Sequence, residues 1–341
     1  MSKPVIALYD VHTLDEGAYR AGLGEEFELI FIDQPLLPAT VERAAHAQVV
    51  SVHVTSQVSA EVMAAIPGLA HVACRTTGYD NVDLAYAKAH HVSVSTVPAY
   101  GQSTVAEYAI LMLLAVTRRI MLAAHSVHAG TIVPEKLTGT ELFGKTLGVI
   151  GTGRIGQHAA TIAKGFGMKL LAYDPYPNQE AAAKIGFTYH DLPELLAQSD
   201  MLTLHAPATP ETHHLLGKEQ FEHMKHGMFI VNTARGTLID TPALVAALES
   251  GVVAGAGLDV LEGEEYLQLE PELHLLGKAE LGDEAREVLG IEILHKMPNV
   301  LITSHNAYNS VEALERIRQT TIENINAWHR GEAHNLVADP N

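Results

Sequence analysis

The stretch from Thr146 to Asp174 constrains the fold of this chain more than any other part of the sequence. A short apolar run, Leu147 to Ile150, ends at the glycine-rich string GTGRIG over residues 151–156. An amphipathic helical pattern follows, and a second apolar run ends in Asp174, 18 residues beyond the last glycine. Strand, glycine turn, helix, strand and acid in this order predict a dinucleotide-binding βαβ unit. The string alone would be a weak indication, because an ordinary glycine turn of an α/β protein can carry it.

Each glycine of this string has a separate physical task. Gly151 permits the tight turn, Gly153 lets the backbone approach a pyrophosphate, and Gly156 lets the helix lie close to the strand. The N-terminus of the helix presents free N–H groups and the positive end of its dipole to the phosphates. Asp174 can accept hydrogen bonds from the adenosine ribose, and its charge would repel a 2′-phosphate. The sequence therefore predicts NAD rather than NADP.

Composition and charge narrow the class of protein. The chain has 341 residues, which suggests about two domains, and 47% are hydrophobic. No apolar run reaches the ~18 residues of a membrane-spanning helix, and the N-terminus lacks the features of a signal peptide. The single cysteine, Cys74, excludes an internal disulfide and a cysteine cluster for zinc, so no metal is expected. These features predict a soluble cytoplasmic protein.

The net charge of −18 and the absence of a basic patch argue against nucleic acid as a partner. An anionic substrate would then need a dedicated local cation. The 20 histidines are scattered, as in His90-His91 and His213-His214, and most are expected at the surface.

The first hundred residues alternate strand and helix patterns, which predicts a parallel sheet with helices on both faces. The expected strands are Val5–Tyr9, Phe27–Ile32, Val49–Val52, Val72–Cys74 and Val92–Ser95, with helices near 13–22, 40–46, 59–66 and 83–89.

The second half repeats the alternation around the glycine string. Strands are expected at 147–150, 168–173, 200–204, 228–232, 254–258 and 299–303, with helices near 154–166, 191–198, 217–225 and 241–249. We expect a substrate domain of residues 1–101 plus 306–341, which includes a C-terminal helix over 311–329, and a nucleotide domain of residues 102–305. A capping box at Thr104 to Glu107 predicts the start of a long apolar helix suited to a subunit interface. The segment 266–296 has a helical and acidic pattern. We expect it to form either a lid or a packing element.

Two loops of the first half follow strands directly. Backbone N–H groups around Thr77 and Gly78 could hold a small carboxylate, since ligands of open α/β sheets lie beyond the carboxyl ends of strands. The alternative is a plain glycine turn before the next helix. In the other loop, Tyr100 could reach a substrate or cap the core.

Three charged or titratable residues follow strands of the nucleotide half: Arg235, Glu264 and His305. We expect them at one carboxyl edge, facing the nicotinamide. Taken singly, each would more often belong to a surface ion pair.

These motifs resemble the D-isomer-specific 2-hydroxyacid dehydrogenases. The matching segments, in family order over nearly the whole chain, are GTGRIG, LHAPATPET (204–212), NTARG (232–236), GLDVLEGE (257–264) and NVLITSHNAY (299–308). Val97 to Tyr100, His305 to Tyr308 and the insertion before His305 are most similar to the D-lactate dehydrogenase branch. Ser304 departs from the proline that commonly precedes the histidine in this family. The resemblance implies two doubly wound parallel-sheet domains, a Rossmann NAD-binding domain and a flavodoxin-like substrate domain.

The resemblance also implies roles for the site residues. His305 would exchange a proton with the carbonyl oxygen, Glu264 would position His305 and favour its charged form, and Arg235 would bind carboxylate and carbonyl oxygen together. Thr77 and Gly78 would hold the substrate carboxylate, with Tyr100 and Tyr308 lining the pocket. The implied cofactor contacts are Gly151, Gly153, Arg154, Ile155, Gly156, Asp174, His205, Ala206, Pro207, Thr212, Thr233, Ala234 and Asp259. Asp259 could instead cap a loop.

The expected function is reduction of pyruvate to D-lactate with NADH, in a homodimer. The alternatives are another 2-keto acid, such as glyoxylate, hydroxypyruvate or a bulkier one, and a dinucleotide-sensing regulatory protein.

Overall fold

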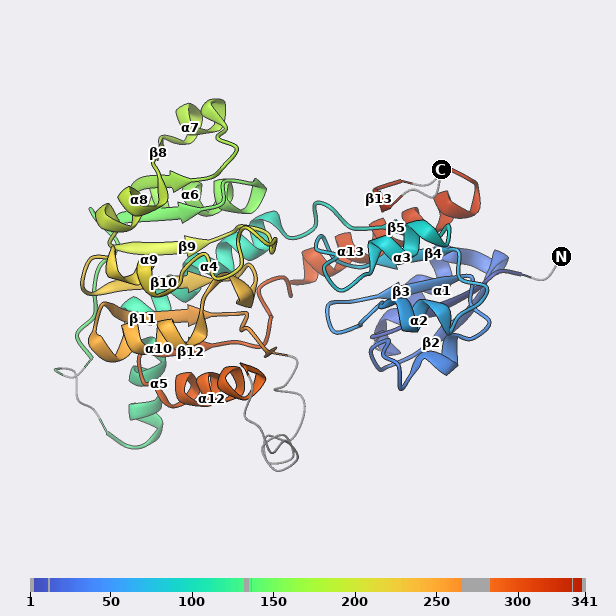
Figure 1. Ribbon diagram of the computed structural model, residues 1–341, viewed down its shortest axis with the longest axis horizontal. Coiled ribbons are helices and arrows are strands. Elements are labelled where there is room, and N and C mark those ends of the chain that lie inside the picture. Colours follow the sequence, from blue (N-terminus) through green and yellow to red (C-terminus); the bar gives the residue numbers. More distant parts are fainter. Residues whose placement is uncertain are drawn as a thin grey trace. The chain divides into compact units, whose positions relative to one another are not determined.

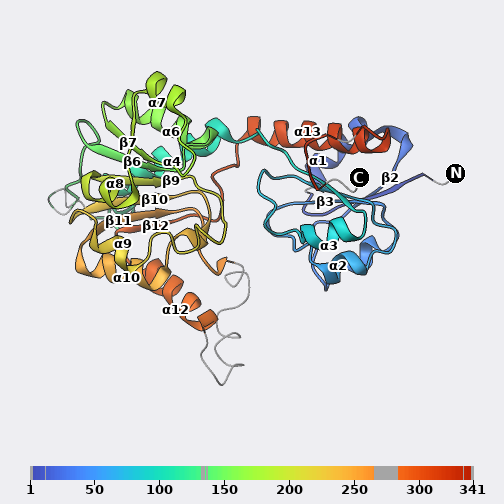
Figure 2. The ribbon, with the colours of Figure 1, turned by 45° about the horizontal axis from the view of Figure 1, so that its top comes forward.

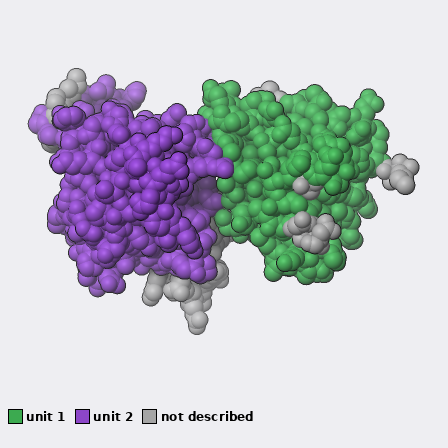
Figure 3. Space-filling model, turned by 90° about the horizontal axis from the view of Figure 1, so that it is seen from above, with its two compact units in different colours: residues 1–100, 310–341 green, residues 101–309 purple. Residues whose placement is uncertain are grey.

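The computed structural model describes residues 3–11, 13–131, 135, 137–264, 283–332 and 334–338 (Figure 1). The chain forms two compact units, coloured separately in Figure 3: unit 1 comprises Met1–Tyr100 with Ser310–Asn341, and unit 2 comprises Gly101–Asn309. The sequence prediction had placed Gly101 and residues 306–309 with the first domain, but both belong to unit 2. Residues 306 and 307 are held there because the buried Asp259 carboxylate accepts their backbone N–H groups, each at 2.8 Å.

Unit 1 contains a six-stranded sheet in the order β13-β5-β4-β3-β1-β2. The order β2-β1-β3-β4-β5 of its parallel strands is that of flavodoxin-like sheets. The sequence predicted a parallel sheet, but β13 pairs antiparallel with β5. The alternating pattern of the first hundred residues did not include β13, which joins the sheet from the C-terminal end of the chain. The strands are β1 Val5–Leu8, β2 Glu28–Phe31, β3 Val49–Val52, β4 His71–Cys74, β5 Ser93–Ser95 and β13 Leu336–Ala338.

Helices cover both faces of this sheet. Figure 2 shows α1 (Thr13–Leu23) and α13 (Val311–His329) together on one face, with α2 (Ala60–Ala64) and α3 (Leu84–Ala89) on the other. The central strands β3 and β4 are buried at every residue, as strands enclosed by helices must be. The helix expected near 40–46 is a 3₁₀ helix, Val41–Ala44.

Unit 2 contains a seven-stranded parallel sheet in the order β12-β11-β10-β9-β6-β7-β8. Chain order reverses between β6 and β9, which is the topological switch point of a Rossmann fold. The sequence prediction missed the short strand β8 and the helix α7 (Gln179–Ile185). The strands are β6 Thr146–Ile150, β7 Lys169–Tyr173, β8 Thr188–Tyr189, β9 Met201–Leu204, β10 Met228–Asn232, β11 Val253–Leu258 and β12 Val300–Ile302.

Two apolar layers enclose this second sheet. One contains α4 (Gln102–Thr117) and α6 (Arg154–Gly165), and the other contains α8 (Leu192–Gln198), α9 (Lys218–Glu222) and α10 (Thr241–Ser250). The helix α12 (Asp283–Lys296) adds the buried Ile291 and Leu294 to the second layer. The C-terminal part of the expected insertion therefore packs on the core, and residues 266–282 of that expectation lie outside the described residues.

The start of α4 corrects one expectation. The helix begins at Gln102 after Gly101, and no side chain caps it, so Thr104 lies inside the helix rather than at its N-cap. The small, flexible Gly101 takes the cap position. α4 is followed by α5 (Ile120–His128) at a bend of 62°. No single helix among the described residues is long and apolar enough to cross a membrane, although this bent pair passes that test of length and composition.

Candidate active site

The glycine string lies where β6 ends and α6 begins. Gly151 has φ +88°, and a Cβ there would lie 2.7 Å from the backbone nitrogen of Ala206. A Cβ on Gly156 would lie 2.0 Å from the carbonyl oxygen of Gly151, so helix and strand approach as closely as the sequence predicted. A Cβ on Gly153 would meet nothing within 4 Å. The backbone there faces open space, which fits a phosphate held at the N-terminus of α6, where Arg154 and Ile155 form the first turn.

Asp174 follows β7, the strand next to β6. One oxygen of its carboxylate accepts hydrogen bonds from the backbone N–H and the hydroxyl of Thr152, at 2.7 and 2.9 Å. The other oxygen accepts the N–H of Tyr176 at 2.9 Å. These bonds fix the carboxylate beside the glycine turn. Thr152 was not singled out in the sequence, although its place inside GTGRIG put it next to the turn.

Two buried polar atoms at the same edge of the sheet lack a hydrogen-bond partner among the described residues: Nδ1 of His205, after β9, and the hydroxyl of Thr233, after β10. The other ring nitrogen of His205 lies 2.9 Å from the hydroxyl of Thr203. Burial lowers the pKa of His205 to about 4, so the ring is neutral near pH 7. Unpaired buried polar atoms are costly, and these two fit the polar groups of a dinucleotide lying along the edge.

The loop after β9 continues this edge. The hydroxyl of Thr212 donates to the carbonyl of Pro207 at 2.7 Å and closes the turn that begins at Ala206. Because a Cβ on Gly151 would lie 2.7 Å from the backbone nitrogen of Ala206, this turn lies beside the glycine turn.

His305 and Glu264 form a contact within unit 2. The Nδ1 of His305 lies 2.8 Å from Oε1 of Glu264, and the other carboxylate oxygen accepts the N–H of Leu261 at 3.1 Å. His305 has a left-handed backbone with φ +52°, held by the hydrogen bond from its N–H to the carbonyl of Asp259 at 2.8 Å. The two side chains are 25% and 37% exposed. With Nδ1 engaged, Nε2 is the ring nitrogen that can exchange a proton with a ligand.

Asp259 caps the loop that precedes and follows His305 in the chain. The residue is buried, and its carboxylate accepts the hydroxyl of Thr303 at 2.5 Å as well as the two N–H groups of Asn306 and Ala307. Three protein donors engage its oxygens, which supports the alternative of a loop cap. It shapes the backbone that carries His305.

Arg235 follows β10 on an extended backbone. The side chain of Asn232 donates to the carbonyl of Arg235 at 2.8 Å, and Nη1 of Arg235 donates to the carbonyl of Ala234 at 2.8 Å. The next residue, Gly236, packs so tightly that a Cβ would lie 2.0 Å from the carbonyl carbon of Leu261. The loops that carry Arg235 and Glu264 are therefore pressed together.

In unit 1, the loop after β4 is held by its own side chains. The hydroxyl of Thr76 donates to the carbonyl of Gly78 at 2.6 Å, and that of Thr77 donates to the carbonyl of Val97 at 2.8 Å. Within the described part of the chain, the N–H groups of Thr77 and Gly78 donate no hydrogen bond to the protein. Tyr100 ends this unit's first segment, and its carbonyl accepts from Arg316 at 2.8 Å.

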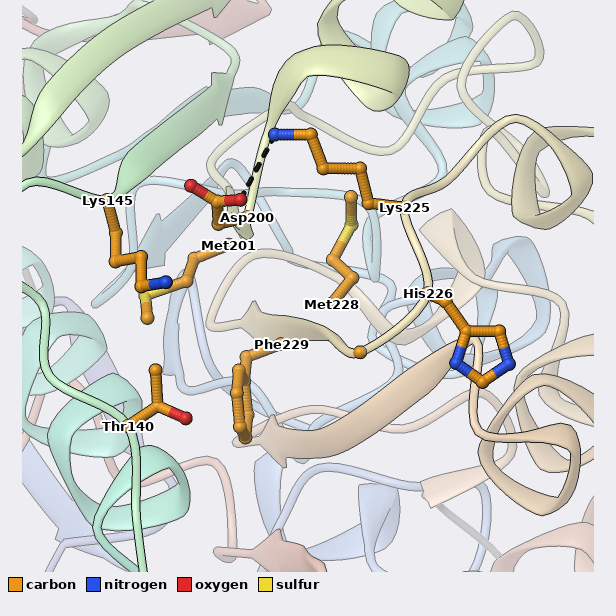
Figure 4. Close-up of a pocket in the computed structure, with 9 residues that line it drawn as sticks. Thr140, Lys145, Asp200, Met201, Lys225, His226, Met228 and Phe229 are labelled. Carbon is orange, nitrogen blue, oxygen red and sulfur yellow. Dashed lines mark hydrogen bonds and ion pairs between the residues drawn. The ribbon is translucent and has the colours of Figure 1, made fainter.

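A cavity of about 180 Å³ in unit 2 lies away from these residues. Figure 4 shows Lys225 paired with Asp200 in its wall, at 3.0 Å. Burial opposes ionisation of Asp200, but bonds from the Thr146 N–H and from Lys225 leave its pKa below the ordinary value. The lining residues Lys145, Met201 and Met228 mark the amino ends of β6, β9 and β10. The cavity is therefore at the edge opposite to the dinucleotide fingerprint.

Comparison with known proteins agrees with this geometry. Residues 110–307 match the family model of the D-isomer specific 2-hydroxyacid dehydrogenase NAD binding domain. The chain is 39% identical to the D-lactate dehydrogenase of Escherichia coli over 96% of this chain and 97% of that protein. It is 36% identical to a glyoxylate reductase of Korarchaeum cryptofilum over 90% of this chain and 88% of that one.

A solved structure gives the same result. The Aquifex aeolicus D-lactate dehydrogenase, crystallised with NAD and lactic acid, superimposes with a TM-score of 0.87 at 34% identity, and covers 98% of this chain and 100% of its own. The chain belongs to the D-isomer-specific 2-hydroxyacid dehydrogenase family. It is an NAD-dependent oxidoreductase with a two-domain fold of Rossmann type, as the sequence predicted.

Proposed function

We propose that this enzyme reduces pyruvate to D-lactate with NADH, and catalyses the reverse reaction. The observation that carries the proposal is the 2.8 Å contact between His305 and Glu264 on loops next to the one that carries Arg235. The similarity to D-lactate dehydrogenases along nearly the whole chain supports this substrate.

Reduction of a 2-keto acid adds hydride to the carbonyl carbon and a proton to its oxygen. Bound NADH supplies the hydride. His305, protonated on both ring nitrogens, gives the proton from Nε2 to the carbonyl oxygen, and takes it back in the reverse direction. Glu264 keeps the ring oriented through Nδ1 and stabilises its positive charge. His205, neutral near pH 7 because it is buried, is not suited to be the acid.

Arg235 supplies the local cation that an anionic substrate needs on a chain of net charge −18. Its planar guanidinium can bind a carboxylate oxygen and the carbonyl oxygen together, which the single ammonium of a lysine cannot do. The N–H groups of Thr77 and Gly78 hold the substrate carboxylate, with Tyr100 and Tyr308 beside it.

For the cofactor, we propose that Gly153, Arg154 and Ile155 hold the pyrophosphate and that Asp174 binds the adenosine ribose. Asp174 keeps oxygen lone pairs beyond the three bonds that fix it. Residues near the nicotinamide are His205, Ala206, Pro207, Thr212, Thr233 and Ala234.

A second candidate is reduction of glyoxylate. The similarity to a glyoxylate reductase at 36% identity favours it, since that protein shares the family chemistry. The test is the initial rate of NADH oxidation with pyruvate, glyoxylate, hydroxypyruvate and phenylpyruvate, followed by chiral analysis of the product. The proposal requires pyruvate to give the highest kcat/KM and D-lactate to be the product. A higher value for glyoxylate would establish the second candidate instead.

We also propose a homodimer that forms through α4 and α5. Their outward side chains include large apolar groups that are more than half exposed: Leu111, Ile120, Met121 and Val127. Such a row is typical of a subunit contact. Size-exclusion chromatography with light scattering should give twice the 36.7 kDa chain mass, and the chain mass itself would refute the dimer.

A further inference from the structure

Three metal-ligating side chains of unit 2 lie together outside the proposed catalytic trio: His213, His214 and Glu262. One ligand atom from each lies within 4.8 Å of the others. Nε2 of His214 is 2.8 and 2.9 Å from the two carboxylate oxygens of Glu262. Nε2 of His213 is 3.6 Å from the nearer of these oxygens. Both imidazoles therefore direct a nitrogen at the same carboxylate.

The backbone holds two of these residues in place. Glu262 is only 8% exposed. Gly236 packs against it so closely that a Cβ would lie 2.2 Å from the nitrogen of Glu262. His214 has φ +50°, and its N–H donates to the carbonyl of Thr237 at 2.8 Å. A ligand set whose backbone is already fixed loses little freedom when an ion binds.

We propose that His213, His214 and Glu262 form a binding site for a divalent transition metal of the zinc type. Zinc binds imidazole nitrogen and carboxylate oxygen at about 2.1 Å, which places tetrahedral ligand atoms about 3.4 Å apart. The observed separations of 2.8 and 3.6 Å lie on either side of this value. To hold the ion, Nε2 of His214 moves about 0.6 Å away from the carboxylate, and the two imidazole nitrogens, which lie within 4.8 Å of each other, turn toward the ion.

The solvent exposure of the three side chains determines which ligand completes the coordination of the metal. The side chains of His213 and His214 are 55% and 36% exposed, whereas that of Glu262 is 9% exposed. Two protein nitrogens and a carboxylate leave a fourth position on the solvent side, which water fills. Magnesium does not suit this set, since it prefers six oxygen ligands in octahedral geometry.

The sequence expectation of no metal rested on the lone cysteine. His213 and His214 stood out only as one of two adjacent histidine pairs, and Glu262 is 48 residues away from His214 in the chain. Only the fold brings the carboxylate to them.

The test is isothermal titration of the full chain, free of dinucleotide, with ZnCl₂ and separately with MgCl₂. The site requires one equivalent of zinc and no magnesium binding. His213→Gln removes an exposed ligand and leaves the His214–Glu262 contact, so it should weaken zinc binding by at least ~10–100-fold. His90→Gln, in the exposed His90-His91 pair, is the matched control and should bind as the wild type does.

Either of two results would overturn the site: no zinc binding by the wild type, or undiminished binding by His213→Gln. Equal weakening by His90→Gln would likewise assign the zinc to surface histidines. Glu262→Gln, with its fold checked by circular dichroism, should lose the same equivalent. None of these readouts depends on dehydrogenase activity, so the proposed substrate and the metal site can fail separately.

Discussion

The two units share an architecture but carry their polar chemistry differently. Each is a doubly wound sheet whose loops follow the carboxyl ends of parallel strands. In unit 2 those loops present titratable side chains, with His305 against Glu264 at 2.8 Å. In unit 1 the corresponding loop presents backbone N–H groups at Thr77 and Gly78, while its threonine hydroxyls donate to the carbonyls of Gly78 and Val97. Proton transfer is therefore expected from unit 2 and anion binding by backbone from unit 1.

Two histidines make the same contrast. His71 in unit 1 is fully buried between the hydroxyls of Ser93 and Ser95, at 2.7 and 2.9 Å, and burial lowers its pKa to about 3. It is neutral and structural. His305 is partly exposed and faces a carboxylate, which suits a group that gains and loses a proton. The environment, and not the residue type, separates the two roles.

The largest expected effect comes from removing the proton carrier. His305→Gln should lower kcat for pyruvate reduction by on the order of 10²–10⁴, the usual share of a general acid. Initial-rate kinetics measures this, with NADH binding by fluorescence as the control for an intact cofactor site. Full turnover by this variant would mean that unit 2 does not supply the proton through His305.

Acid should destabilise both units through their buried histidines. Burial lowers the pKa of His71 to about 3 and that of His205 to about 4, whereas an unfolded histidine titrates near 6.5. As the pH falls below about 6.5, the unfolded state binds protons at these histidines that the folded state does not bind. The free energy of unfolding should therefore drop by roughly 2.5 kcal/mol per histidine by about pH 4.5.

Urea denaturation at several pH values checks this loss. His71→Asn should flatten the acid dependence, because the replaced side chain does not titrate. The exposed His91→Asn is the control and should keep the slope of the wild type. An identical slope for His71→Asn would show that His71 does not contribute.

Asp174→Ala should reduce the preference of unit 2 for NAD over NADP. The change removes an acceptor for the ribose hydroxyls and a charge that repels a 2′-phosphate. Hydrogen bonds to charged groups contribute ~1.5–3 kcal/mol, so the ratio of kcat/KM values should fall by roughly 10–100-fold. An unchanged ratio would count against Asp174 as the selector.

The smallest effect is expected in the loop of unit 1. Thr77→Ser keeps the hydroxyl that donates to Val97 and keeps the backbone N–H. KM for pyruvate should then change by less than about 3-fold, within the ~0.5 kcal/mol typical of mild substitutions. A large rise in KM would mean that the methyl group of Thr77 matters, and that unit 1 acts through a side chain after all.

Most of the fold was predictable because its strands and helices have clear periodic patterns and glycine turns. Elements fixed by tertiary contacts escaped: β13 pairs antiparallel with a strand more than 200 residues earlier in the chain. Local rules also misled at Thr104, where a capping-box pattern lies within a helix that begins at Gln102. The boundary at 306–309 depended on the buried Asp259, whose bonds to later residues the sequence could not show.

In the candidate site, too, local sequence patterns identified some residues, and tertiary contacts determined the others. His305, Glu264 and Arg235 could be selected from the sequence because each follows a strand inside a motif. The loop-capping task of Asp259 and the convergence of His213, His214 and Glu262 could not, since they depend on which loops the sheet brings together.

The most direct test of the central claim is the pH profile of kcat/KM for pyruvate reduction and for D-lactate oxidation, in the wild type and in Glu264→Gln. Reduction needs protonated His305 and oxidation needs it neutral, so the reduction optimum should lie at lower pH than the oxidation optimum. Loss of the carboxylate removes the acceptor that orients His305 through Nδ1, so both profiles should change in the variant. Profiles that coincide in the wild type and stay unmoved in Glu264→Gln would contradict the account.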